Sequence, residues 1–115
     1  MKTIKINIDV TGLKMAEEDK GVPGQELFKR IFKHYCLLWA QQWKQGEPVR
    51  MTEDDRHLCY KIWDALDNGI KESLDSIDLE DNQMGFMKKV KREVLNIPNE
   101  LTRKFEDAVD EVKDR

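Results

Sequence analysis

The stretch Thr3-Ile4-Lys5-Ile6-Asn7-Ile8-Asp9-Val10 decides the fold class of this chain, because it alternates strictly between polar and apolar side chains. A period of two is typical of a β-strand with one buried face, and the β-branched side chains favour the extended backbone. Thr11-Gly12 follows as a turn, after which Leu13 and Met15 have the spacing of a short second strand. The rest of the chain has helical periodicity, so this strand region (3–15) makes the predicted class α+β.

A polar loop at residues 16–25, which contains two glycines and a proline, separates this strand region from the first predicted helix. We predict that helix at residues 25–44, because its apolar side chains fall on one broad face: Leu27, Phe28, Ile31, Phe32, Tyr35, Leu38, Trp39 and Trp43. Leu37 points away from this face and should be exposed. Gly46 ends the helix, and residues 48–51 have extended character and could pair with the first strand.

Three further helices are predicted, at about residues 52–74, 80–95 and 99–112, from their apolar spacing and their start signals. Thr52 precedes three carboxylates, which is the pattern of an N-cap followed by an acidic first turn. A break is expected at residues 75–78. We therefore expect one domain over residues 1–115, in which a short N-terminal strand or two-stranded sheet packs on a three- to four-helix bundle. In that domain the helical core spans 26–96 and a C-terminal amphipathic helix spans 99–113.

Composition and charge narrow the classes of function. The 115 residues are 37% charged and carry a net charge of −3, against about 25% charged residues in ordinary globular domains. A slightly acidic chain has no general attraction for nucleic acid or for an anionic membrane. The apolar run 36–40 is far shorter than the roughly 20 residues that span a bilayer. The two cysteines predict no disulfide framework, and the N-terminal residues carry no secretion signal, so we expect a cytoplasmic protein.

A repeated His-x-Cys pattern supplies the four residues of a zinc site, His34 and Cys36 in one predicted helix and His57 and Cys59 in the next. Residues two apart in a helix point in nearly opposite directions, so neither pair can chelate one ion. We therefore predict semi-buried cysteines, surface histidines, no metal and no cofactor. A Cys36–Cys59 disulfide between adjacent helices is geometrically conceivable, but a reducing compartment disfavours it.

Two acidic clusters invite a catalytic or calcium-binding interpretation. In the cluster of Glu53, Asp54, Asp55 and His57, the spacing places Glu53 and Asp54 within reach of the imidazole. No nucleophile or strained turn accompanies them, so we predict no enzyme. The stretch 75–82 has carboxylates at alternate positions but lacks the glycine and the closing glutamate of a calcium loop. Its Ser76 or Asp78 is interpreted instead as a helix cap.

Two surfaces are candidates for binding. The fourth predicted helix has a narrow apolar stripe that either packs on the domain or docks on a protein partner or a second copy of the chain. The residues predicted to bind a partner are Leu101, Phe105, Val109 and the outward Leu37. The alternative is a small nucleic-acid-binding regulator that uses a basic ridge on the third helix, formed by Lys88, Lys89, Lys91 and Arg92. That ridge could equally be a solvated helix face.

The segment Trp39 to Asp55, with Gly46-Glu47-Pro48-Val49-Arg50-Met51-Thr52 at its centre, resembles small phage and prophage proteins of unassigned function. In those proteins an N-terminal strand leads to a helix ending in an aromatic segment, then a Gly-Glu-x-Val turn and a helix with an acidic start. The charged C-terminal helix departs from that pattern. The resemblance implies a non-enzymatic accessory protein that acts through protein–protein contact, and it brings no catalytic residues.

Overall fold

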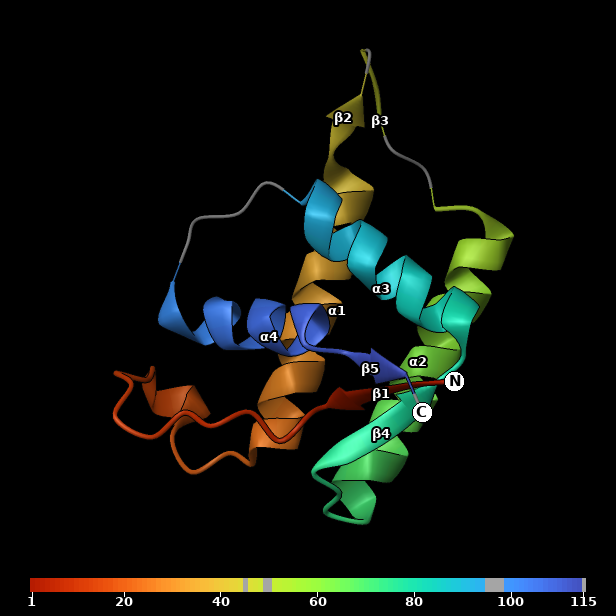
Figure 1. Ribbon diagram of the computed structural model, residues 1–115. Coiled ribbons are helices and arrows are strands. Elements are labelled where there is room, and N and C mark those ends of the chain that lie inside the picture. The colour runs from red at the N-terminus through yellow and green to blue at the C-terminus, as the bar shows by residue number, and fades with distance from the viewer. Residues whose placement is uncertain (45, 49–50, 95–98, 115) are drawn as a thin grey trace.

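Helices dominate the computed structural model, which describes residues 1–44, 46–48, 51–94 and 99–114. In that part of the chain, a small antiparallel sheet lies against one side of a group of four helices (Figure 1). The helices are α1 (Gly24–Gln41), α2 (Glu53–Lys71), α3 (Asp81–Glu93) and α4 (Glu100–Asp110). The fold is α+β and mostly helical, as predicted, with the N-terminal strand packed on the helices. None of the described helices combines the length and the apolar character that a bilayer span requires.

β1 (Lys2–Lys5) is the middle strand of the sheet, between β4 (Ser76–Leu79) and β5 (Lys113–Asp114) (Figure 1). Both pairings are antiparallel, and in the first of them Ile4 lies opposite Ile77. The N-terminal strand therefore finds its partners in the second half of the chain. This differs from the prediction, which placed a second strand at Leu13 and Met15 or at residues 48–51.

Neither segment that was predicted to pair with the first strand does so in the structure. Residues 13–15 are irregular, and the loop that follows contains a short 3-10 helix, Glu17–Asp19. β3 (Glu47–Pro48) pairs with β2 (Trp43–Lys44) just after α1, and not with β1. Residues 49–50, which also belonged to the predicted extended segment, lie outside the described residues, as do Ile97 and Pro98 between the last two helices.

Residues 75–78, predicted as a break between helices, mostly belong to β4. Ile77 and Leu79 are buried on one face of the strand, and the Thr3 hydroxyl donates a hydrogen bond to Asp78 Oδ1 at 2.7 Å. The prediction of Ser76 or Asp78 as a helix cap is wrong. The N-cap of α3 is Glu80, whose backbone N–H donates to Gln83 Oε1 at 3.0 Å.

The strand predicted at residues 3–10 ends at Lys5, although its isoleucines remain buried as far as Ile8. Lys5 lies opposite Ser76, the first residue of β4, so the ladder has no further strand residue beyond it. The backbone N–H groups of Ile6 and Asn7 both donate instead to the Asp75 carbonyl, at 2.8 and 3.1 Å. The chain therefore leaves the sheet while its apolar face stays in the core.

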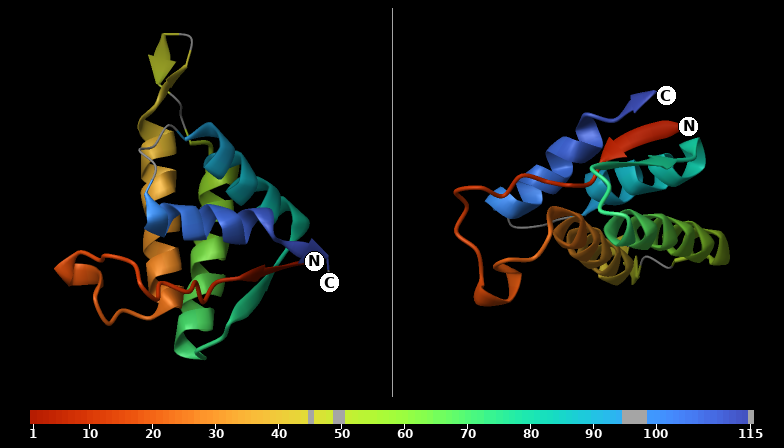
Figure 2. Two further views of the ribbon diagram at one scale, coloured as in Figure 1. Left: turned by 60° about the vertical axis from the view of Figure 1, so that its left-hand side comes forward. Right: turned by 90° about the horizontal axis from the view of Figure 1, so that it is seen from below.

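α1 and α2 lie side by side along one side of the molecule, with β1 and α4 on the other (Figure 2). The predicted N-cap of α2 is confirmed, because the Asp55 backbone N–H donates to Thr52 Oγ1 at 3.1 Å. α2 then runs through Gly69 and ends at Lys71. The apolar stripe predicted for the first helix is buried at most of its positions: Leu27, Phe28, Ile31, Phe32, Tyr35 and Trp39.

α4 crosses α1 and places Phe105 among aromatic side chains of that helix (Figures 1 and 2). The ring centroid of Phe105 lies 4.9 Å from that of Phe28 and 5.0 Å from that of Tyr35, with both ring pairs tilted. Tilted aromatic pairs at such distances are favourable beyond the area that they bury. Phe105 is fully buried, so α4 is an integral part of the core.

Two helical glycines allow the N-terminal segment to approach both long helices closely. A Cβ atom on Gly24, at the start of α1, would lie 2.6 Å from the Ile8 carbonyl oxygen and 2.9 Å from its backbone nitrogen. A Cβ atom on Gly69, in α2, would lie 2.6 Å from Ile6 Cδ1 and 2.9 Å from Ile77 Cγ2. Because Cβ contacts below about 3 Å do not occur without displacement, any larger residue here would push the helices away from the sheet.

We predict that Gly24→Ala destabilises the protein by about 1–3 kcal/mol, because the added methyl overlaps backbone atoms that cannot rotate away. The matched control is Gly85→Ala in α3, where a Cβ has no neighbour within 4 Å. Alanine there should stabilise the protein by about 0.5–1 kcal/mol, because glycine weakens a helix interior. Urea unfolding followed by circular dichroism measures both values. Equal effects of the two substitutions would contradict the close contact at Gly24.

Candidate functional site

The fourth helix does not offer the partner-binding surface predicted for it. Phe105 and Val109 are fully buried in the core and Leu101 is half-buried, so the stripe is used inside the domain. Phe105 and Val109 are therefore excluded as docking residues in this fold. Leu37 behaves as predicted, because 54% of its surface is exposed on the outer side of α1.

An apolar groove runs between α1 and α2 beside Leu37. Its volume is about 300 Å³. α1 contributes positions 33, 36, 37 and 40, and α2 contributes 56, 59, 60 and 63, which is the same spacing of three, four and seven residues on each helix. That spacing places each set on one helix face. The lining residues are Lys33, Cys36, Leu37, Ala40, Met51, Arg56, Cys59, Tyr60 and Trp63.

Aromatic side chains form the α2 wall of this groove. Tyr60 has 52% of its surface exposed, and its ring packs edge-on against Trp63 with 5.6 Å between centroids. The Lys33 ammonium lies 4.7 Å from the centre of the Trp63 ring, a cation–π distance. The Trp63 indole nitrogen is buried and has no hydrogen-bond acceptor among the described residues. A buried N–H without an acceptor costs free energy, so this atom carries a cost within the fold.

The charged residues of the groove lining are both basic. Lys33 and Arg56 have no carboxylate within ion-pair distance in the described part of the chain. The protein as a whole carries a net charge of −3, so the groove is a local exception to its acidic balance. An apolar floor with cations beside it attracts an apolar ligand that carries negative charge.

A pair of cysteines lies at the floor of the groove. Cys36 Sγ and Cys59 Sγ are 3.8 Å apart, and both thiols are free and buried. The pKa of Cys59 is lowered because the Cys36 S–H donates a hydrogen bond to its sulfur, against the opposing effects of burial and of Asp55. The pKa of Cys36 is raised by its role in the same hydrogen bond and by burial. The two sulfurs therefore form one hydrogen-bonded pair, in which the pKa of Cys59 is the lower.

The other candidate chemistry from the sequence is not assembled into a site. His34 and His57 are exposed while the cysteines are buried. Among the described residues, no group of three or more His, Cys, Asp or Glu side chains could hold a metal ion. His57 Nε2 lies 3.7 Å from Glu53 Oε1, with both side chains largely in solvent at the start of α2.

The basic ridge on α3 is partly occupied by contacts within the fold. The Lys91 ammonium lies 2.8 Å from Asp110 Oδ1, and the Lys89 ammonium lies 5.3 Å from the centre of the Trp39 ring. Lys88 and Arg92 are exposed. Glu106 and Asp110 line the same hollow as Lys88, Lys91 and Arg92, so the ridge adjoins negative charge from α4.

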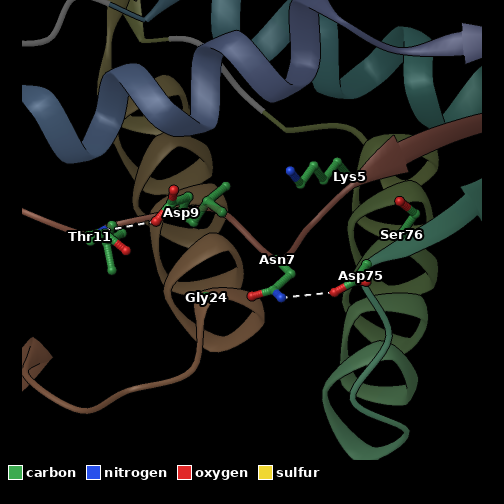
Figure 3. A pocket seen from close by; sticks show the side chains of 9 residues that line it. Lys5, Asn7, Asp9, Thr11, Gly24, Asp75 and Ser76 are labelled. Carbon is green, nitrogen blue, oxygen red and sulfur yellow. Dashed lines mark hydrogen bonds between the residues drawn. The ribbon is translucent and has the colours of Figure 1, made fainter.

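A second hollow, of about 500 Å³, lies where β1 leads towards the start of α1 (Figure 3). Its lining is mixed, because Ile8 and Val10 lie among polar residues. Its polar side chains bond within the protein: Asn7 Nδ2 donates to Asp75 Oδ1 at 2.9 Å. The Thr11 backbone N–H donates to Asp9 Oδ1 at 3.0 Å, and bonds from Thr11 lower the pKa of Asp9. Because both carboxylates already accept hydrogen bonds from the chain itself, the apolar groove is the stronger candidate.

Of the groove residues, the sequence pattern singled out only Leu37 as a binding residue. Tyr60, Lys33 and Arg56 fall outside the main apolar stripes, and nothing local shows that the two helices bring them to one face. The signal that was available is the matched spacing of positions 33, 36, 37 and 40 with 56, 59, 60 and 63. It becomes meaningful only when α1 and α2 are known to pack side by side.

Comparisons with protein-family models, with curated proteins and with solved structures find no match to this chain. What the groove binds therefore has to be inferred from its own side chains.

We predict opposite behaviour for two residues of the partner-binding set. Phe105→Ala should lower the free energy of unfolding by about 3–5 kcal/mol, because it empties a fully buried aromatic position. Leu37→Ala should change it by no more than about 0.5 kcal/mol, because the side chain is mostly in solvent. Chemical denaturation of both variants measures these values. A small cost for Phe105→Ala would mean that α4 is not docked as described.

Proposed function

We propose that this protein is a non-enzymatic interaction protein, of the phage-type accessory class that its sequence resembles. In this proposal it binds an amphipathic, acidic segment of a partner protein in the groove between α1 and α2. The observation that carries the proposal is an apolar groove with large exposed side chains, Leu37 and Tyr60, whose charged lining residues, Lys33 and Arg56, are both basic.

The apolar lining supports a protein ligand. Contact residues that dominate binding energy are enriched in tyrosine, tryptophan and arginine, and the groove contains Tyr60, Trp63 and Arg56. Two parallel stripes with helical spacing form a trough that suits an amphipathic helix with apolar residues at positions one, four, five and eight. Exposed leucine and tyrosine side chains gathered at one groove are also more typical of a contact surface than isolated exposed apolar residues are.

The charges specify an acidic segment. A partner carboxylate could pair with Lys33 or Arg56 without displacing a carboxylate of this chain. Charges at the edge of an interface contribute mainly to the association rate and to selectivity, so the apolar contacts would supply most of the affinity.

The nucleic-acid alternative stays a prediction from the sequence. Two of its four residues, Lys89 and Lys91, already contact Trp39 and Asp110. No other feature of the described residues favours it over the groove, so we do not put it forward as a second function.

The experiment is a selection of helical peptides with randomised surface positions, displayed as a library, against the full-length protein. We expect the selected peptides to carry apolar anchors beside carboxylates. Leu37→Asp should weaken their binding by at least about tenfold, as loss of a central apolar contact does. Leu74→Asp is the matched control, because Leu74 is also exposed but does not line the groove. Fluorescence anisotropy of a labelled peptide measures each affinity.

Three outcomes would decide against the proposal. The first is no enrichment of peptides, and the second is equal loss of binding in Leu37→Asp and Leu74→Asp. The third is self-association of the unliganded protein that Leu37→Asp abolishes, because the occupant of the groove would then be a second copy of this chain. Sedimentation velocity of the wild-type protein and the Leu37→Asp variant detects that third case.

A further inference from the structure

The cysteine pair has a geometry that the docking function does not need. Cys36 lies on α1 and Cys59 on α2, 23 residues apart in sequence, and their sulfurs are 3.8 Å apart. The two helices run in opposite directions, and the β2–β3 pair lies between them in the sequence (Figure 1). Both cysteines are buried beneath the groove and both line it. The groove therefore gives small molecules access to two sulfurs that are otherwise enclosed.

We propose that Cys36 and Cys59 form a dithiol site that hydrogen peroxide converts into a disulfide joining α1 to α2, and that a thiol reductant restores. The inference does not rest on the docking function, because the sulfurs, their separation and their access are properties of the chain alone.

The packing of the two helices brings the sulfurs close to bonding distance. A disulfide requires a separation of about 2.05 Å, so the gap of 3.8 Å must close by less than the radius of a sulfur atom. Side-chain rotation with a slight approach of the helices can supply that movement. Neighbouring atoms in the core do not block the approach, because each sulfur is already the hydrogen-bonding neighbour of the other.

Each sulfur is the hydrogen-bonding neighbour of the other, so once one is oxidised the second lies beside it. The hydrogen bond from Cys36 stabilises the thiolate of Cys59, and the thiolate is the nucleophilic form of cysteine. This direction favours reaction at Cys59 first, and reaction at Cys36 first would give the same disulfide, because the two sulfurs are neighbours. Hydrogen peroxide is a suitable oxidant because it is small enough to reach buried sulfurs through the groove.

The reaction balances in two steps. The Cys59 thiolate attacks one oxygen of hydrogen peroxide, the O–O bond breaks, and a sulfenic acid forms while hydroxide leaves with the proton that Cys59 lost, as water. The Cys36 thiol then attacks the sulfenic sulfur, the S–O bond breaks, and hydroxide leaves with the Cys36 proton as a second water. Two thiols lose two electrons, which reduce one peroxide molecule.

The Cys36–Cys59 disulfide would change the shape of the groove at its floor. It draws the two helices together at Cys36 and Cys59, directly beneath Leu37 and Tyr60. It also closes a covalent loop around the β2–β3 pair and the start of α2. Such a cross-link restricts the unfolded chain, so the oxidised protein should unfold at a higher urea concentration than the reduced protein.

The test treats reduced, full-length protein with hydrogen peroxide and follows its intact mass. We expect the loss of two hydrogen atoms per chain, a cross-linked pair of proteolytic fragments that contain Cys36 and Cys59, and recovery of the starting mass with dithiothreitol. Alanine variants serve as controls, because alanine leaves no buried hydroxyl. Each single alanine variant should take up oxygen at its remaining thiol and form no disulfide within the chain.

The measurements on the wild-type protein test the proposed disulfide even if an alanine variant fails to fold. Uptake of oxygen without a fragment cross-link, or a cross-link between two chains in place of one within a chain, would overturn the proposal. So would a lower urea midpoint after oxidation, because it would show that the disulfide does not fit the packing of α1 against α2.

Discussion

The close contact of the N-terminal segment with two helical glycines is the constraint on which the rest of the structure depends. Ile8 lies against Gly24 at the start of α1, and Ile6 lies against Gly69 in α2, at distances that leave no room for a Cβ atom. One short extended segment thereby sets the positions of both long helices. The sheet and α4 cover one side of this helix pair, and no element of the described residues covers the face with Leu37 and Tyr60.

α4 shows what amphipathic periodicity can and cannot specify. Its apolar stripe correctly indicates that the helix buries one face, but an identical stripe could pack on its own domain or on a partner. The choice depends on whether the domain has an apolar surface left to receive it. Here Phe28 and Tyr35 of α1 form that surface, and Phe105 fills it. Of the four residues predicted to bind a partner, the exposed one is Leu37, which lies off its helix's main stripe.

Local features of the fold were predictable, whereas long-range pairings were not. The alternating pattern from Ile4 to Ile8 and the N-cap at Thr52 each depend on a few consecutive residues. In the structure the three isoleucines are buried and Thr52 caps α2. β4 has only two apolar positions between acidic residues, and its pairing with β1 joins Ile4 to Ile77 across most of the chain. A short sequence pattern cannot predict a contact over such a distance along the chain. The groove could not be predicted for the same reason, because its residues come from two helices and the packing of those helices has to be known first.

The measurement that tests this account most directly is the exposure of methyl groups to a soluble paramagnetic agent, read by methyl NMR on the full-length protein. If the sheet covers one side of the helix pair and leaves the groove open, the Leu37 methyls should relax much faster than those of Ile6, Ile77 and Val109, which are buried. Relaxation of Ile6 or Val109 as fast as that of Leu37, or protection of Leu37, would contradict it.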